Sequence, residues 1–307
     1  MKLSPWYIVF MLFMIGCACD IVEQKPKKII KATGNAVVEK EPMIRIDSIG
    51  SNLDTVTKEN ETFDTTVVTV NELVNEFSFV DHFETKSCLI IDWIKKNRGR
   101  SLNKGELLMI EYRLSLPNGK IIDGNNRMEL PYLPFVLGFN MQNKGWDEAL
   151  ALMRVGDIAQ VKIPANLAYG EKGLGELIPP NTENWLFVKI HGIVSPTSDL
   201  DGIKIWELNS GKSSGLKEMS KVKFHMIVSS ESRANILNTY TSNFPVTYTP
   251  GQKNYPIGLR KVLNNAKIGQ QIFVVLNSEM ASIESGDLGV SNSKESVFYN
   301  LKILEIE

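Results

Sequence analysis

Few side chains in this sequence of 307 residues belong to the types that usually carry covalent or metal chemistry. Three cysteines and three histidines are scattered along it, at Cys17, Cys19, Cys88, His82, His191 and His225. Metal centres and disulfide frameworks need such residues in closely spaced groups, so the sequence predicts neither. A Cys–His nucleophile pair stays open as an alternative. Cys88 has no supporting motif, however, and a half-buried cysteine on a helix is the better interpretation.

Length and charge limit the classes of function. At roughly 100–200 residues per domain, the chain has room for two domains and additional segments. Its formal net charge of -1 leaves no basic field that would concentrate nucleic acid. We therefore expect no nucleic-acid partner.

Cys17 follows an apolar segment near the N-terminus. The apolar run from Trp6 to Ile15 is shorter than the roughly 20 residues that span a bilayer, but it suits a secretory signal. The run leads into Met-Ile-Gly-Cys, which resembles a bacterial lipobox and implies that residues 1–16 are a lipoprotein signal peptide and that Cys17 carries lipid. The chain resembles lipoproteins with a neutral residue after the acylated cysteine, here Ala18, and this resemblance implies a place in the outer membrane, facing the periplasm. The alternatives are an ordinary signal or an uncleaved anchor, and Cys19 fits a lipobox less well because the apolar run ends before it.

The next two segments lead to the folded part of the chain. Residues 17–70 are mostly polar and show no sustained periodicity, which predicts a flexible tether. Between residues 71 and 97 apolar residues return at helical spacing, at Leu73, Phe77, Val80, Leu89, Ile90, Trp93 and Ile94. We expect one or two lead-in helices here, whose apolar face packs on the following domain or on another envelope protein.

Residues 98–195 have the pattern of an α+β domain. Alternating apolar residues from Leu108 to Leu116 predict a half-buried strand, which a Pro-Asn-Gly turn ends. A short helix follows, with apolar residues at Trp146, Ala149, Leu150 and Met153 and a stop at Gly156. Further strands at 158–163 and 186–193 predict an antiparallel sheet wrapped around that helix.

Three linked motifs occur in this domain. They are Gly-Trp-Asp-Glu-Ala-Leu with Met-Arg-Val-Gly-Asp between 145 and 157, Ile-Pro with Leu-Ala-Tyr-Gly between 163 and 170, and Ile-Pro-Pro-Asn at 178–181. In this order and spacing they resemble the FKBP-type peptidyl-prolyl cis/trans isomerases, over about a third of the chain. With the lipobox, the chain is similar to the gliding-motility-associated lipoprotein isomerases.

The resemblance implies a proline-binding pocket and no metal or cofactor. It gives catalytic roles to Tyr112, Asp123, Trp146 and Tyr169, and substrate-binding roles to Phe135, Gln142, Asn143, Ile178 and Phe187. Trp146 would form the floor, Tyr169 would offer its hydroxyl to the substrate carbonyl, and Asp123 would lie at the rim near the twisting amide.

Some positions depart from the family. Ile122 stands where an aromatic residue is common, and the polar pair Gln142-Asn143 replaces two aliphatic residues. The segments 127–134 and 181–185 are longer than usual, so that either Phe187 or Val188 is the inward residue of the last strand. We therefore expect weak or selective activity.

Residues 200–307 repeat the pattern of the central domain. A shift of 113 aligns the two from Gly138 onward without a gap, and a shift of 112 places the strand Val222–Val228 on Ile110–Leu116. This predicts a second, divergent FKBP-like domain without the site. Its residues at the site positions are Leu259 for Trp146, Ser282 for Tyr169, Asn292-Ser293 for the proline pair and, approximately, Asn235 for Asp123.

These features favour an enzyme, a lipid-anchored isomerase that acts on proline-containing polypeptides during folding of exported envelope proteins. A proline-segment-binding chaperone is the first alternative, favoured by Gln142-Asn143 and the second domain. The other alternative is a structural lipoprotein of an envelope complex.

Overall fold

The computed structural model describes residues 78–126, 130–212, 220–284 and 294–307. The expected signal peptide, Cys17, the tether and residues 71–77 lie outside these ranges. Phe79–Glu307 belong to one compact unit. No helix in the described ranges is long and apolar enough to cross a membrane.

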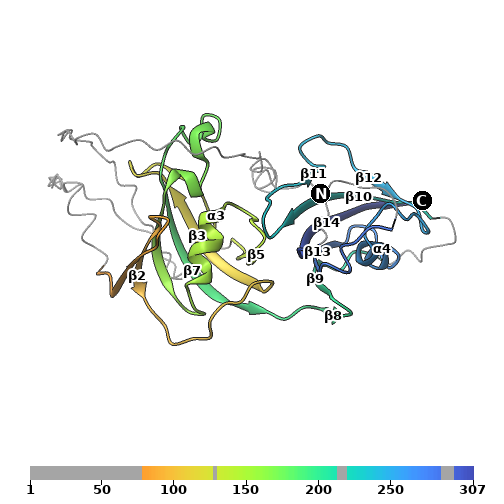
Figure 1. Ribbon diagram of the computed structural model, residues 1–307, viewed down its shortest axis with the longest axis horizontal. Coiled ribbons are helices and arrows are strands. Elements are labelled where there is room, and N and C mark those ends of the chain that lie inside the picture. Colours follow the sequence, from red (N-terminus) through yellow and green to blue (C-terminus); the bar gives the residue numbers. More distant parts are fainter. Residues whose placement is uncertain (1–77, 127–129, 213–219, 285–293) are drawn as a thin grey trace, which may run out of the picture. The chain divides into compact units, whose positions relative to one another are not determined.

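The central domain is built on an antiparallel sheet of seven strands. They are β1 (Asp81–Glu84), β2 (Ile90–Lys95), β3 (Leu107–Ser115), β4 (Ile121–Gly124), β5 (Leu133–Val136), β6 (Ile158–Ile163) and β7 (Asn184–Val194). The strand order is β1-β2-β6-β7-β3-β4, and β5 pairs with the other part of β3. Helix α3 (Lys144–Ala151) lies against one face (Figure 1), and two short 3-10 helices, η1 (Ala165–Leu167) and η2 (Gly170–Lys172), follow β6.

Helix α3 packs on the sheet through the residues that its periodicity predicts. Trp146, Ala149 and Leu150 are buried in one core with the inward residues of β3, β6 and β7. The strands contribute every second residue, as expected when one face of an antiparallel sheet is covered. The helix begins after Asn143, whose side chain accepts a hydrogen bond from the backbone N–H of Trp146.

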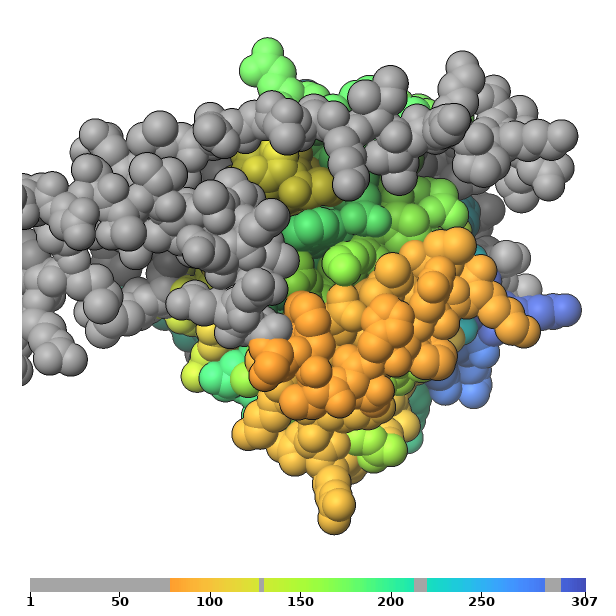
Figure 2. All heavy atoms as spheres, turned by 90° about the vertical axis from the view of Figure 1, so that its left-hand side faces the viewer, coloured from red at the N-terminus to blue at the C-terminus, as the bar shows by residue number. Residues whose placement is uncertain are grey.

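The lead-in helices are wrong for the described part of 71–97, which forms the hairpin β1–β2. Leu89, Ile91 and Trp93 are 0 %, 0 % and 2 % exposed, so the buried apolar residues recur at a period of two and not 3.6. Strand β2 pairs with β6, and the Trp93 indole donates to Asp157 at 3.0 Å. Figure 2 shows the hairpin in orange on the surface of the domain. Cys88, expected on a helix, is exposed in the turn between the two strands, with φ at 63°.

A second sheet of seven strands has the same topology. Its strands are β8 (Ser198–Leu200), β9 (Ile203–Asn209), β10 (Val222–Ser230), β11 (Leu237–Asn238), β12 (Val246–Tyr248), β13 (Gln271–Leu276) and β14 (Val297–Ile306), and helix α4 (Ile257–Leu263) precedes β13. The order β8-β9-β13-β14-β10-β11, with β12 on β10, matches the first sheet strand by strand. The repeat in the sequence therefore corresponds to a repeated fold.

The register of β10 corrects one part of the sequence alignment. Tyr112 pairs with Val188 in the first sheet, and Met226 pairs with Leu301 in the second. Val188 and Leu301 are 113 residues apart and are therefore equivalent in the alignment of the two domains. Their partners Tyr112 and Met226 are then equivalent too, which gives β10 a shift of 114 and not 112. A strand moved by two residues keeps the same inward and outward faces, so its alternation alone does not distinguish the two shifts.

Candidate functional site

The floor of the candidate site is the indole of Trp146, in the first turn of α3. Its ring centroid lies 5.1 Å from that of Tyr112 on β3 in an edge-to-face arrangement, and 6.0 Å from that of Phe135 on β5 in a stacked one. All three side chains are 3 % exposed or less. Three elements thus bring aromatic rings together as the family resemblance implies, and such pairs prefer these geometries.

Asp123 is held next to Tyr112 by the pairing of β4 with β3. The Tyr112 hydroxyl donates to Asp123 Oδ2 at 2.7 Å, and Asp123 Oδ1 accepts from the backbone N–H of Gly124 at 2.8 Å. Burial raises the pKa of Tyr112, and the charge of Asp123 and this hydrogen bond raise it further. Tyr112 therefore stays a neutral donor that fixes the carboxylate.

Tyr169 lies between the two 3-10 helices and is partly buried against the same core. Burial raises its pKa to about 12, an effect that Asn143 opposes and that the negative charge of Asp123 increases. Tyr169 is thus a neutral hydroxyl close to Asn143 and Asp123. The four expected catalytic residues, Tyr112, Asp123, Trp146 and Tyr169, therefore converge on one site.

The apolar walls are completed by Ile178 and by the last strand. Ile178 and Val188 are fully buried in the core, and Ile122 packs against it from the rim. Phe187 is wrong as an inward residue because β7 turns its neighbours Leu186 and Val188 to the core. Instead, the Phe187 ring lies on the other face, where the Arg113 guanidinium is 5.8 Å from its centroid.

Asn143, from the polar pair before α3, and Trp146 both carry a buried hydrogen-bond donor at the start of the helix. Gln142 is partly exposed, and Asn143 is 7 % exposed. Within the described residues, Trp146 Nε1 is buried without a hydrogen-bond partner, and Asn143 Nδ2 is buried near the Tyr169 hydroxyl without a hydrogen bond of normal geometry. Unpaired buried donors are rare in folded proteins, and a carbonyl of a bound peptide would satisfy them.

Asn125 is a positioning residue that the sequence analysis did not identify. Its Oδ1 accepts from the backbone N–H of Tyr112 at 2.7 Å, and its Nδ2 donates to the carbonyls of Ile110 and Pro131, each at 3.0 Å. The side chain therefore connects β3 with the loop before β5. An asparagine just after Asp-Gly at a strand end is the sequence signal that could have identified it.

The second domain carries apolar residues at the equivalent positions. The pairing of Leu237 with Val228 corresponds to that of Asp123 with Leu114, so Asp123 corresponds to Leu237 and not to Asn235. Tyr112 is replaced by Met226 and Trp146 by Leu259. At the position of Gln142 stands Tyr255, which is 7 % exposed and contacts the rings of Phe224 and Tyr248. The described residues of this domain therefore do not form the same site.

The described ranges contain no group of three or more histidine, cysteine, aspartate or glutamate side chains placed to hold a metal ion. The residues that converge are aromatic, hydroxyl and carboxylate groups around an apolar floor. Such a set of groups suits non-covalent binding of a proline ring and its amide, since it offers apolar contact and hydrogen bonds.

Comparisons with known proteins agree with this geometry. Residues 99–191 match the family model of the FKBP-type peptidyl-prolyl cis-trans isomerases. FK506-binding protein 1 of Dictyostelium discoideum is 34 % identical over 88 residues, which are 29 % of this chain and 81 % of that protein. The FK506-binding protein of Neisseria meningitidis is 33 % identical over 93 residues, which are 30 % of this chain and 84 % of that protein.

Among solved structures, the chain is similar to the crystal structure of AtFKBP13, at 27 % identity and a TM-score of 0.35. The match covers 37 % of this chain and 99 % of that one. Both sequence relatives are more than 30 % identical and are matched over most of their own length. This chain belongs to the family of FKBP-type peptidyl-prolyl cis-trans isomerases.

Proposed function

We propose that this isomerase works at the bacterial cell envelope, held by lipid on Cys17, and that it assists the folding of exported proteins. Its substrates would be proline-containing segments of those proteins. The constellation of Tyr112, Asp123 and Trp146 supports catalysis on prolyl bonds. The lipobox-like sequence before Cys17 supports the location, and its neutral following residue favours the outer membrane facing the periplasm.

The physical basis of catalysis is loss of amide resonance in a dry pocket. The barrier to rotation about a peptide bond is about 18–20 kcal/mol and arises from that resonance. Water that donates to the amide oxygen favours the planar form, so a pocket lined by Trp146, Phe135 and Ile178 favours the twisted one by excluding water. Donors such as the Tyr169 hydroxyl would orient a neighbouring carbonyl.

The rate of X-Pro isomerisation in a peptide, followed by NMR exchange, tests the site. Trp146→Ala should reduce the acceleration by the full chain at least about tenfold, because it removes the floor against which the proline ring packs. Trp185→Ala is a matched control, since Trp185 lies on β7 next to the inward Leu186 and is not part of the pocket. An equal loss in both variants would contradict the assignment of the floor.

A second candidate is a chaperone that binds proline-rich segments with little turnover. The polar Gln142-Asn143 pair and the second domain without the site favour it. Titration of a proline-rich peptide distinguishes the two functions. Binding that Trp146→Ala abolishes, with no acceleration by the wild type, would support the chaperone.

Metabolic labelling with a fatty acid tests the anchor. We expect Cys17→Ser to abolish incorporation of the label and to release the protein from the membrane fraction. Cys19→Ser is the matched control and should keep both. Loss of the label in Cys19→Ser alone would show that Cys19, and not Cys17, carries the lipid. Absence of the label in the wild type would contradict the lipid anchor.

A further inference from the structure

The two domains share a third apolar cluster that belongs to neither domain core. It consists of Leu107, Val136, Phe139, Trp206, Phe273, Val275 and Phe298, all buried, with Met141 packed against it. The centroids of Phe139 and Phe298 are 6.0 Å apart, and those of Phe298 and Phe273 are 5.1 Å apart. We call this set the interdomain cluster.

The cluster residues of β3 and β13 lie on the face of each sheet that points away from that sheet's own domain core. Phe273 and Val275 alternate along β13 with Ile272, Val274 and Leu276, which fill the core of the second domain. Because successive side chains of a strand point to opposite faces, the cluster residues lie on the side of the sheet away from that core. The same holds for Leu107 beside the inward Leu108 of β3.

The first domain contributes to this cluster from strands β3 and β5, through Leu107 and Val136, and from the loop that leads to the start of α3. Loop 137–143 carries Phe139, and it also carries the pocket residues Gln142 and Asn143. Met141 packs against both the first domain core and the interdomain cluster. One side of the loop therefore rests on the second domain while its end caps the helix of Trp146.

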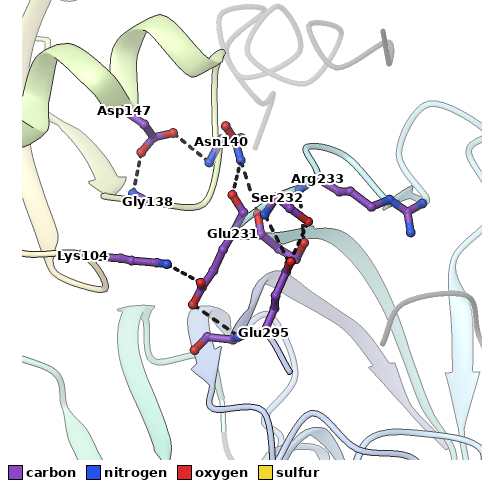
Figure 3. A network of polar contacts seen from close by, with 10 residues as sticks. Lys104, Gly138, Asn140, Asp147, Glu231, Ser232, Arg233 and Glu295 are labelled. Carbon is purple, nitrogen blue, oxygen red and sulfur yellow. Dashed lines mark hydrogen bonds and ion pairs between the residues drawn. The ribbon is translucent and has the colours of Figure 1, made fainter. Parts of the chain in front are cut away.

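Polar contacts hold the same loop, as Figure 3 shows. Asn140 is 6 % exposed, and its Nδ2 donates to the carbonyls of Ser230 and Glu231 at 3.4 and 3.1 Å. Lys104 forms an ion pair with Glu231. On the other side, Asp147 in the first turn of α3 accepts from the backbone N–H groups of Gly138 and Asn140.

We propose that the second domain positions the isomerase site of the first, by fixing loop 137–143 and through it the start of α3. Asn140 and Phe139 are the positioning residues on the loop, and Phe298 and the carbonyls of Ser230 and Glu231 are their partners. The proposal rests on the isomerase site described above. It assigns a role to a domain whose described residues do not form that site.

Asn140→Gly in the full chain tests this proposal. Asn140 has φ at 49°, which glycine adopts freely, so the substitution removes the two interdomain hydrogen bonds while the backbone bond to Asp147 remains. We expect amide hydrogen exchange of peptides covering 137–146 to become about tenfold faster, the effect of losing about 1.4 kcal/mol. The value of kcat/KM should fall with it, mainly through KM, because the pocket wall is less well fixed.

Phe298→Ala applies the same test from the second domain, and Phe244→Ala is its control because Phe244 is 77 % exposed and outside the cluster. We expect faster exchange at 137–146 in the first variant and unchanged exchange in the second. Unchanged exchange at 137–146 and unchanged kcat/KM in folded Asn140→Gly would overturn the proposal. The exchange measurement does not require catalysis, so an inactive wild type would contradict the isomerase assignment and leave this test intact.

Discussion

The hydroxyl of Tyr112 and the carboxylate of Asp123 form the most sharply defined polar contact in the pocket, at 2.7 Å. Only one other described donor, the Gly124 N–H at 2.8 Å, holds Asp123. The position of the carboxylate at the rim therefore depends on Tyr112.

We expect Tyr112→Phe to lower kcat/KM about tenfold and the free energy of unfolding by about 1–2 kcal/mol, since it leaves a partly buried carboxylate with one bond fewer. Peptide isomerisation and urea unfolding measure the two effects. Tyr299→Phe is the matched control. Tyr299 is 1 % exposed and its hydroxyl has no partner within the described ranges, so its removal should leave stability unchanged or raise it. A larger loss in Tyr299→Phe would contradict this reasoning.

Asp147 supplies a pH-dependent contribution to stability. Burial raises its pKa from 3.8 to about 6, against the lowering by the N–H groups of Gly138 and Asn140 and by the charge of Lys104. At pH values between these two pKa values, the Asp147 carboxyl binds its proton more tightly in the folded state than in the unfolded chain. The contribution of Asp147 to the free energy of unfolding therefore falls as pH rises through this window, by at most about 3 kcal/mol.

Asp147→Asn removes this titration. Urea unfolding at several pH values should show the wild type gaining stability relative to the variant as pH falls from about 7 to about 4. Other carboxyl groups titrate equally in both proteins and cancel in the difference. A difference that does not change with pH would show that burial does not control this carboxyl.

At the scale of elements, the contact between α3 and β6 sets the depth of the pocket floor. Gly145, the residue before Trp146, is buried, and a Cβ added to it would lie 2.2 Å from Ile163 Cγ2. The helix can approach the sheet this closely only because that Cβ is missing.

Gly145→Ala should therefore lower the free energy of unfolding by about 1–3 kcal/mol, the usual cost of overpacking, and should reduce kcat/KM by displacing Trp146. Gly192→Ala on β7 is the matched control, because an added Cβ there meets nothing within 4 Å and its φ is not positive. We expect no loss of stability in the control. Urea unfolding measures the stability of both variants. Equal stability of Gly145→Ala and Gly192→Ala would contradict the close approach of α3 to β6.

The elements also show what the sequence could and could not predict. Helix α3 and strand β3 follow from local periodicity, and the four catalytic residues were predicted from the resemblance of the linked motifs to a family. The hairpin β1–β2 was mistaken for helices because Leu89, Ile90, Trp93 and Ile94 also fit a helical spacing. Only the pairing of β2 with β6, a long-range contact, decides between the two periods.

Long-range contacts also account for the remaining errors. Phe187 and Val188 are both apolar, and only the pairing of Val188 with Tyr112 on β3 shows which one faces the core. The interdomain cluster has a weak local signal, namely that β13 is apolar on both faces. That signal indicates a covered face but does not identify the loop of the first domain that covers it.

At the scale of the whole molecule, the interdomain cluster should couple the unfolding of the two domains. Seven buried side chains from both domains exclude water there, and Phe139 contributes to this cluster and not to the first domain core. The loss of either domain would expose the cluster residues of the other. We therefore expect the slowest amides of β6 and β13 in the wild type to exchange with the same free energy of opening.

Phe139→Ala should separate these two free energies. Removing a buried phenylalanine costs about 3–5 kcal/mol, and here the cost falls on the interface while each domain keeps its own core. The less stable domain then opens alone, and its strand exchanges faster than the other. Phe244→Ala should leave the two strands coupled, because Phe244 is outside the cluster. Separate opening of β6 and β13 already in the wild type would mean that the interface adds little stability. The second domain would then do little to fix loop 137–143 and the start of α3.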